Sequence, residues 1–368
     1  MAPRVIVVGG HSAGHIEPAM NFADALRRLE PTAEITALGT VRGLDTMLIP
    51  ARGYPLALIP PVPLPRTLNW ALLRTPGRLR ESARAAGVVL DRVRAEVVVG
   101  FGGYVAVPAY LAARGRGLPI VVHEANARPG VANRLAARMT THVFTAAPSV
   151  RLAHATAIGI PLRPAITGLD RPALRDAARR RFGLRPDGPV LLVTGGSQGA
   201  QAINAAVSGA AAALRATGVQ VLHITGPRHL AEVPDGDPAD PPYVVIPYVD
   251  EMQYAYAAAD FVICRSGAMT CAELAAVGLP AAYVPLPPRR GEQRLNAAPV
   301  VAAGGALLVD NADFDPAWIE TTLIPVLTDP ERIATMSAHA SADDAPDANV
   351  VLARHVLSVV AERRRFAS

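Results

Sequence analysis

The sequence predicts an α/β protein with parallel, doubly wound sheets, divided into two halves of similar design. Apolar runs of four to six residues alternate with helical stretches rich in alanine and arginine along most of the chain. Such short runs are typical of strands that are buried on both faces of a parallel sheet. A layout of apolar run, glycine-rich turn and helix occurs at 5–19 and again at 189–204. With 368 residues, the chain is long enough for two domains that each bury a core.

The predicted strands follow one another with helical stretches between them. Proline and glycine interrupt both periodicities at 159–172, where we expect the two halves to join. The stretch 347–366 has the pattern of an amphipathic helix with a basic end. These features predict two Rossmann-like halves. The predicted strands lie at 5–8, 96–101, 119–124, 189–195, 219–226 and 260–267.

The composition narrows the class of protein. Apolar residues make up 51% of the chain and aromatic residues only 5%, so the cores must consist mainly of alanine, valine and leucine. The two cysteines, Cys264 and Cys271, match no usual metal-ligand spacing and indicate a reducing cytoplasm. The net charge of +5 favours anionic partners such as nucleotides, pyrophosphates or an acidic membrane surface. No motif of interleaved basic and aromatic residues indicates nucleic-acid binding.

The first glycine-rich turn, 9–15, ends in a histidine at the start of the expected helix. Glycines there allow a ligand to approach the backbone, and the helix offers free N–H groups to an anion. The dinucleotide fingerprint G-x-G-x-x-G is absent, and no acidic residue clearly closes a second strand. The residues alone therefore leave two interpretations of the turn, phosphate binding or tight packing. They likewise leave His15 either structural or catalytic.

Two further turns in the second half offer groups for a nucleotide. The turn 195–199 carries Ser197, whose hydroxyl and neighbouring amides suit a diphosphate. In the stretch 264–280 a strand ends, a helix begins near Ala268, and Glu273 lies one to two turns further on. A carboxylate there could accept two hydrogen bonds from the vicinal hydroxyls of a ribose, or it could simply complement the helix dipole.

Two other polar stretches are candidates for ligand binding. Gln293, in the turn 285–297, could bind sugar hydroxyls or lie on a solvated helix start. Glu124 and Asn126 follow a predicted strand, at the edge of an open α/β sheet where ligands usually bind.

Eight motifs in fixed order resemble the MurG family of peripheral glycosyltransferases, which transfer N-acetylglucosamine from UDP-N-acetylglucosamine to lipid I and form lipid II. The resemblance runs over nearly the whole chain. Its motifs are GHSAGHIEPA, GFGGYVAVP, HEANARPGVANR, GIPLR, GGSQGAQAIN, PYVDEM, CRSGAMTCAELAAVGLP and GEQRLNA.

The resemblance implies the GT-B fold, in which two Rossmann-like domains face a cleft. It places the acceptor and membrane side in residues 1–163 and the UDP-sugar site in 164–346, with the helix 347–368 crossing back to the first domain. It also implies an inverting transfer in which helix N-termini and arginine stabilise the leaving diphosphate. No cofactor or dedicated metal site is expected, although a divalent ion could assist.

The resemblance assigns the donor contacts residue by residue. The backbone of Val249 would hold uracil, and Glu273 would accept hydrogen bonds from the ribose hydroxyls. Asn126 and Gln293 would hold the sugar. The implied diphosphate contacts are Arg163, Ser197, Ala268, Met269 and Thr270, and the turn that closes over the sugar is Ser12, Ala13 and Gly14.

The resemblance also gives His15 a catalytic interpretation, as the general base or as a group that orients the attacking hydroxyl. Histidine side chains ordinarily titrate near pH 6.5, which suits proton uptake at neutral pH. Glu124 is the alternative base. Tyr104 and His11 would lie on the acceptor side. The stretch 66–80 interleaves apolar and arginine residues and would contact the anionic inner membrane surface, so the protein is expected at the cytoplasmic face of the membrane.

Several positions in the N-terminal half depart from the usual family pattern. In the first turn, His11 stands where glycine is usual and Ser12 follows it at the third position. The other departures are Ala106, Val107 and Ala125. The donor motifs are nearly intact. A UDP-sugar transferase with another acceptor, such as a specialised metabolite or lipid, therefore stays an alternative. A UDP-N-acetylglucosamine epimerase and a non-catalytic UDP-sugar-binding module are further alternatives.

Overall fold

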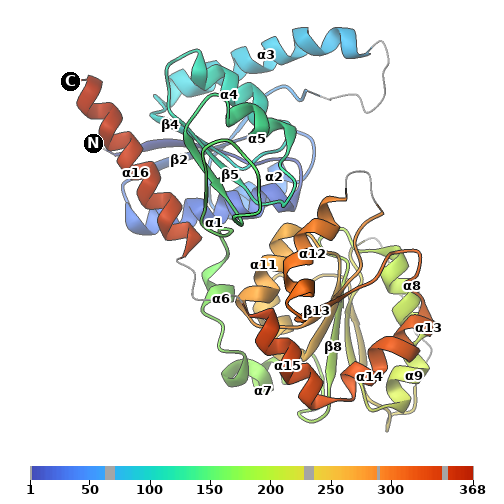
Figure 1. The fold of residues 1–368 in the computed structure, drawn as a ribbon. Helices are drawn as coiled ribbons and strands as arrows, with labels where there is room; N and C mark the ends of the chain where they lie inside the picture. Colours follow the sequence, from blue (N-terminus) through green and yellow to red (C-terminus); the bar gives the residue numbers. More distant parts are fainter. Residues whose placement is uncertain (1, 63–70, 228–235, 288–290, 342–346, 368) are drawn as a thin grey trace. The chain divides into compact units, whose positions relative to one another are not determined.

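A computed structural model describes residues 2–62, 71–227, 236–287, 291–341 and 347–367. The chain divides into two compact units (Figure 1). Unit 1 consists of Met1–Leu162 and Ala345–Ser368, and unit 2 of Arg163–Asp344. Each unit contains one sheet in which every described strand pair is parallel, so the α/β prediction with two Rossmann-like domains is confirmed.

The sheet of unit 1 has seven described strands in the order β3-β2-β1-β4-β5-β6-β7. The run of β-branched residues in β1 is buried on both faces, and successive side chains alternate between two apolar cores. The strands are β1 (Arg4–Val8), β2 (Glu34–Gly39), β3 (Leu56–Leu58), β4 (Val97–Gly100), β5 (Ile120–Glu124), β6 (His142–Thr145) and β7 (Ala155–Ala157).

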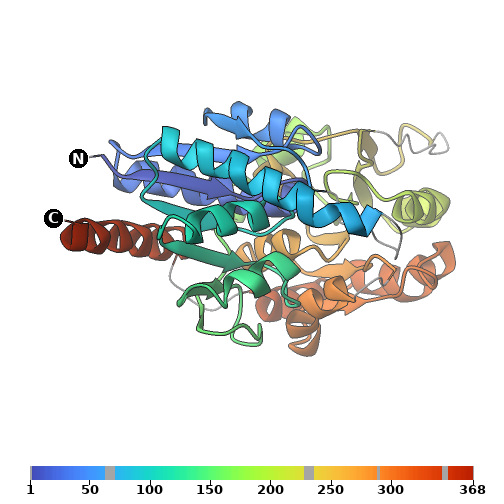
Figure 2. The same ribbon diagram turned by 90° about the horizontal axis from the view of Figure 1, so that it is seen from above.

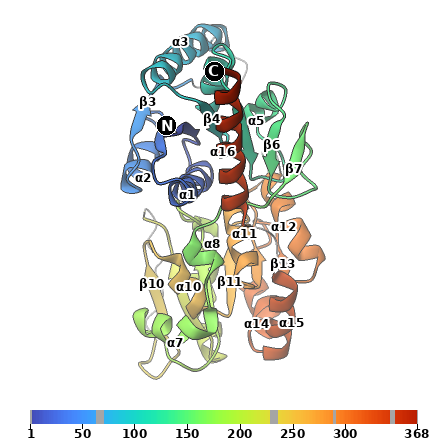
Figure 3. The ribbon, with the colours of Figure 1, turned by 90° about the vertical axis from the view of Figure 1, so that its left-hand side faces the viewer.

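Helices cover both faces of this sheet. On one face α1 and α16 lie side by side (Figure 3) and contribute Phe22 and Val356 to the core. On the other face α3 and α4 lie side by side (Figure 2) and contribute Leu90 and Tyr110. The helices of unit 1 are α1 (Ala13–Leu29), α2 (Asp45–Ala51), α3 (Ala71–Arg92), α4 (Ala106–Arg114), α5 (Val131–Ala136) and α16 (Ala348–Ala367).

The last helix belongs to unit 1 because polar contacts attach it at both ends. At its start, the side-chain amide of Asn349 donates to the carbonyl of Leu162 at 2.8 Å. Near its end, Arg364 donates to both carboxylate oxygens of Glu96, at 2.7 and 2.8 Å. The apolar face between these contacts completes the core over α1.

The sheet of unit 2 has six described strands in the order β10-β9-β8-β11-β12-β13. They are β8 (Val190–Thr194), β9 (Gln220–Ile224), β10 (Tyr243–Ile246), β11 (Phe261–Cys264), β12 (Ala281–Tyr283) and β13 (Ala306–Leu308). The helical segments are α6 (Pro164–Thr167), α7 (Arg171–Arg181), α8 (Gln201–Gly209), α9 (Ala211–Ala216), α10 (Met252–Ala258), α11 (Ala268–Ala276), α12 (Glu292–Ala302), α13 (Pro316–Trp318), the π-helix η1 (Ile319–Leu323), α14 (Ile324–Leu327) and α15 (Pro330–Ala340).

Three arginines of α7 attach this helix to α10 and to the segments that precede β11 and follow α11. Arg179 is only 1% exposed and contacts the carboxylate of Asp260 at 2.9 Å. Arg175 contacts the other oxygen of Asp260 at 2.7 Å. Arg171 donates to the main-chain carbonyls of Tyr256, Ala259, Val277 and Gly278.

The structure confirms the six predicted strands and contains seven that the sequence pattern does not predict. Four of these seven, β3, β7, β12 and β13, have only three residues each, too few to show a clear periodicity. Among the described residues, no helix is both long and apolar enough to cross a membrane.

Candidate active site

The glycine-rich turn of unit 1 packs tightly against the start of α1. Ser12 precedes the helix in an extended conformation, and its carbonyl accepts hydrogen bonds from the amides of His15 and Ile16 at 3.1 Å each. A Cβ on Gly9 would lie 2.4 Å from the carbonyl oxygen of His15. Close packing, one of the two interpretations of this turn, therefore accounts for Gly9.

A second glycine-rich segment, 100–104, meets the first turn although the two lie far apart in the sequence. A Cβ on Gly103 would lie 2.7 Å from the carbonyl oxygen of Gly10, and one on Gly102 would lie 3.3 Å from the His15 ring. Gly102 and Gly103 adopt φ angles of +90° and +80°, which favour glycine. Tyr104, which follows them, is half exposed at the carboxyl end of β4.

His15 lies in the first turn of α1 with a defined tautomer. Its Nδ1 is 2.9 Å from the carbonyl oxygen of Phe101. A carbonyl oxygen can only accept, so in the neutral ring Nδ1 carries the proton and Nε2 carries the lone pair. The side chain is half buried. Because Nδ1 already carries a proton, Nε2 is the ring atom that can accept one.

Glu124, the alternative base, is 2% exposed and is surrounded by donors from the following loop and from α5. One oxygen accepts from the main-chain and side-chain nitrogens of Asn126, at 2.9 and 3.2 Å. The other accepts from the amide of Gly130 at 2.9 Å and from the side chain of Asn133 at 3.0 Å. Asn133 in turn accepts from the hydroxyl of Tyr110 at 3.0 Å. This geometry holds the loop 124–133 in shape and places Asn126.

His123, beside Glu124, is fully buried and serves the fold. Its Nε2 donates to the carbonyl of Gly159 at 2.8 Å, and burial lowers the pKa of His123 to about 4. The ring therefore stays neutral at physiological pH and links the end of β5 to the segment after β7.

One acidic residue of the site, Asp45 at the start of α2, is not among the residues predicted from the sequence. It is fully buried, and its carboxylate accepts from the amide of His11 at 2.6 Å and from the amide of Thr40 at 2.9 Å. Asp45 thus holds the glycine-rich turn rather than a ligand. The only local signal was an acidic residue in a first helical turn, which is usually attributed to the helix dipole.

In unit 2, Glu273 lies in α11 and is 8% exposed. Its Oε2 accepts from the hydroxyl of Tyr256 at 2.7 Å. Gly267, the residue before α11, has no side chain to cap the helix. The amides of the first turn of α11 therefore carry the positive end of the helix dipole. Ala268, Met269 and Thr270 make up this first turn and are half buried.

Three further hydrogen bonds involve the predicted donor residues Arg163 and Gln293 or the segments beside them. The guanidinium of Arg163 donates to the carbonyl of Asp250, next to the half-buried Val249, at 3.2 Å. Asn296 of α12 donates to the carbonyl of Ser266, just before α11, at 3.2 Å. Gln293 accepts from the amide of Leu286 at 2.9 Å and so ties the start of α12 to the segment after β12.

Ser197 lies half buried in the turn between β8 and α8. It follows Gly196, whose φ of +82° favours glycine.

The candidate residues lie at the carboxyl ends of strands in each unit. In unit 1, the turn 12–14 and His15, Tyr104 and Asn126 lie at or just beyond these ends. In unit 2, Ser197 and the first turn of α11 lie at the corresponding ends.

Comparisons with known proteins identify the family. The model of the glycosyltransferase family 28 N-terminal domain matches residues 5–145, and that of the C-terminal domain matches 190–352. The chain is 55% identical over 361 residues to the UDP-N-acetylglucosamine--N-acetylmuramyl-(pentapeptide) pyrophosphoryl-undecaprenol N-acetylglucosamine transferase of Thermobifida fusca, covering 98% of this chain and 95% of that protein. It is 56% identical over 369 residues to the transferase of the same name from Mycolicibacterium smegmatis, and the match covers 99% of this chain and 96% of that protein. The chain belongs to the MurG family.

A solved MurG structure supports the same assignment for the fold. The crystal structure of Acinetobacter baumannii MurG matches with a TM-score of 0.77 at 26% identity and covers 98% of this chain and 100% of that one. The resemblance inferred from the motifs is therefore confirmed.

Four of the departures from the usual MurG pattern, at Ala106, Ala125, Val107 and His11, have different surroundings in the structure. Ala106 and Ala125 are buried, at 0% and 6% exposure, and so act on packing. Val107 lies half buried in α4. His11 is exposed and has a φ of +79°. A residue with a side chain is strained in this conformation, whereas the glycine that is usual at this position in MurG proteins would not be.

We expect His11→Gly to raise the free energy of unfolding by about 0.5–1 kcal/mol, because the strain relieved exceeds the added chain entropy. Urea denaturation measures this change. The neighbouring Ser12→Gly is the control: Ser12 has a φ of −130°, so glycine there should lower stability. Equal destabilisation by both substitutions would contradict the strain argument.

Proposed function

We propose that the protein transfers N-acetylglucosamine from UDP-N-acetylglucosamine to N-acetylmuramyl-(pentapeptide) pyrophosphoryl-undecaprenol, lipid I, and so forms lipid II for peptidoglycan synthesis. The observation that carries this proposal is the 55–56% identity to transferases of that name over 98–99% of the chain. A different acceptor, an epimerase or a non-catalytic module is not favoured at this level of similarity.

The proposed reaction is a single inverting displacement. The acceptor hydroxyl oxygen forms a bond to the anomeric carbon, and the bond from that carbon to the diphosphate oxygen breaks. The hydroxyl proton passes to Nε2 of His15, whose Nδ1 is held by the carbonyl of Phe101. That hydrogen bond also stabilises the imidazolium that forms.

Glu124 is proposed as a positioning residue rather than the base. Four donors, three from its own loop and one from Asn133 of α5, surround its two oxygens, so its carboxylate is already committed to ordering the segment with Asn126. Asn126 and Gln293 are proposed to bind the transferred sugar, and Ser12, Ala13 and Gly14 to close over it. Tyr104 and His11 are proposed to face the acceptor.

The leaving UDP takes up negative charge as the glycosidic bond breaks. We propose that the first-turn amides of α11, at Ala268, Met269 and Thr270, stabilise this charge together with Arg163 and Ser197. The backbone at Val249 would hold uracil and Glu273 the ribose. Transfer from an activated donor changes no oxidation state, so we propose that no cofactor is required.

Transfer of labelled N-acetylglucosamine to a short-chain lipid I analogue tests the function. The expected result is labelled lipid II that requires the enzyme and UDP-N-acetylglucosamine. Binding of UDP-N-acetylglucosamine with transfer to a different acceptor would overturn the lipid I assignment. Conversion of the donor without any acceptor would instead indicate the epimerase.

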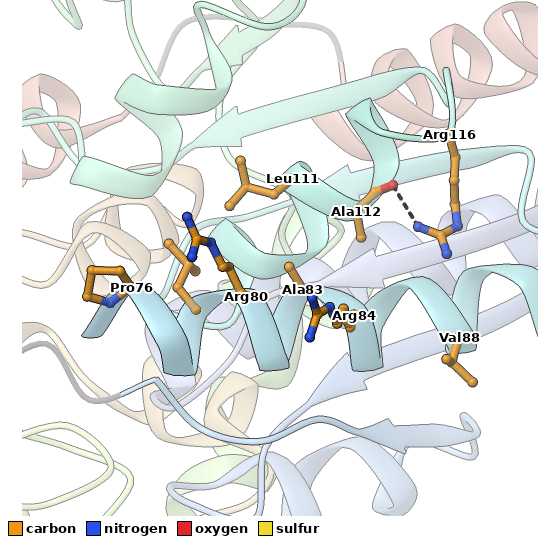
Figure 4. A pocket seen from close by; sticks show the side chains of 9 residues that line it. Pro76, Arg80, Ala83, Arg84, Val88, Leu111, Ala112 and Arg116 are labelled. Atoms are coloured by element: carbon orange, nitrogen blue, oxygen red, sulfur yellow. Dashed lines mark hydrogen bonds between the residues drawn. The ribbon is translucent and has the colours of Figure 1, made fainter. Parts of the chain in front are cut away.

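We propose further that the α3 side of unit 1 contacts an anionic membrane surface at the cytoplasmic face. A groove of about 690 Å³ lies between α3 and α4, with Leu79, Ala83 and Leu111 among its lining residues (Figure 4). Arg80 and Arg84 lie along it on α3 and are exposed. An apolar groove beside arginines suits acyl chains next to anionic headgroups. Of the predicted stretch 66–80, residues 66–70 lie outside the described residues.

Reversal of three charges on this face should abolish membrane binding. We expect the variant Arg78→Glu/Arg80→Glu/Arg84→Glu to lose sedimentation with phosphatidylglycerol vesicles, because each arginine near an anionic surface contributes about 1 kcal/mol. The matched control reverses the exposed Arg28, Arg151 and Arg354 of unit 1, which changes the net charge equally. Equal loss in both variants would indicate a net-charge effect and contradict a defined α3 surface.

A further inference from the structure

A buried hydrogen bond joins two helices of unit 2 beside the proposed nucleotide site. The hydroxyl of Tyr256, in α10, donates to Oε2 of Glu273, in α11, at 2.7 Å. The two residues are 2% and 8% exposed. Burial and the neighbouring charge of Glu273 raise the pKa of Tyr256 well above its ordinary value, so the phenol stays protonated and is the donor.

The same tyrosine lies in α10, the helix that follows Val249, whose backbone is proposed to hold uracil. α10 begins at Met252, three residues after Val249, and the intervening carbonyl of Asp250 accepts from Arg163 at 3.2 Å. The bond from Tyr256 thus connects this segment to Glu273.

We propose that Tyr256 is a positioning residue that orients Glu273 toward the ribose hydroxyls and thereby sets the preference for a ribonucleoside diphosphate. This inference rests on the proposed function, in which Glu273 binds the ribose of UDP. A carboxylate has about four acceptor positions, so one bond from Tyr256 is compatible with two more from a vicinal diol. A glutamate has several rotatable bonds, and holding it in place before binding removes part of the entropy cost of binding.

The experiment compares UDP with 2′,3′-dideoxy-UDP, which lacks both ribose hydroxyls, by titration calorimetry. For Tyr256→Phe we expect UDP to bind about tenfold more weakly, since a hydrogen bond to a charged group is lost. The affinity for the dideoxy analogue should change less than about twofold. The ratio of the affinity for UDP to that for the analogue therefore falls about tenfold. The KM for UDP-N-acetylglucosamine should rise with little change in kcat.

The ratio of two affinities measured on one sample does not depend on the fraction of folded protein. Tyr254→Phe, on the same helix, is the matched control, because that ring stacks on Arg181 instead and should leave the preference unchanged. In a Glu273→Ala background, Tyr256→Phe should have no further effect on the ratio if it acts through Glu273.

A preference for UDP that Tyr256→Phe leaves unchanged would overturn the inference while leaving the proposed function intact. Equal weakening of both ligands also leaves the ratio unchanged, and it would overturn the inference because it indicates a merely structural role for Tyr256. If the native protein binds UDP no better than the dideoxy analogue, the proposed role of Glu273 fails and the inference with it.

Discussion

His15→Ala is expected to lower kcat for lipid II formation by about 100- to 10,000-fold, the usual contribution of a general base. The hydrogen bond from Nδ1 to Phe101 leaves Nε2 as the only ring atom that can take the acceptor proton. The proposed nucleotide contacts lie mainly in unit 2, so the affinity for UDP should change little. A loss confined to kcat would separate the loss of a base from the loss of donor binding.

His15→Asn is the matched control for this prediction. Asparagine can donate to the carbonyl of Phe101 but offers no basic nitrogen, so it should restore stability and not activity. Transfer rates and thermal unfolding of both variants measure the difference. Recovery of most of the activity by asparagine would show that orientation of the turn, rather than proton uptake, is what His15 provides.

Arg179→Met is expected to lower the free energy of unfolding by about 3 kcal/mol, the largest effect on stability that we predict. The Arg179 side chain is 1% exposed, so its contacts form out of water. Its loss removes the bond to Asp260 and leaves the carbonyls of Ala258 and Pro186 without this donor. Urea denaturation followed by circular dichroism measures the change.

Arg175→Met provides the comparison, because Arg175 contacts the same carboxylate but is 35% exposed. A partly exposed ion pair contributes about 1 kcal/mol or less. We therefore expect Arg175→Met to cost at most a third of what Arg179→Met costs. Equal effects would mean that the charge on Asp260, and not the burial of Arg179, determines the stability of this contact.

The strands with clear patterns could be predicted because burial on both faces leaves a continuous apolar run, as in β1, β4 and β8. β7 could not, because its three residues are exposed and acquire strand structure only by pairing with β6. The glycine-rich turns were also visible in the sequence, since positive φ angles and close backbone approach require glycine. His11 adopts such a conformation without being glycine, and no local pattern indicates this.

The sequence by itself determined the fold class, the two Rossmann-like units, the family and the candidate residues. These follow from patterns within a few residues, such as strand runs, glycine turns and helix starts, and from the order of the motifs. Only the tertiary structure decided which partner each polar side chain has. The bond from His15 to Phe101 spans 86 residues and that from Arg179 to Asp260 spans 81. Such pairs form only after strands distant in sequence align, because hydrogen bonds depend on distance and angle in space rather than on separation along the chain.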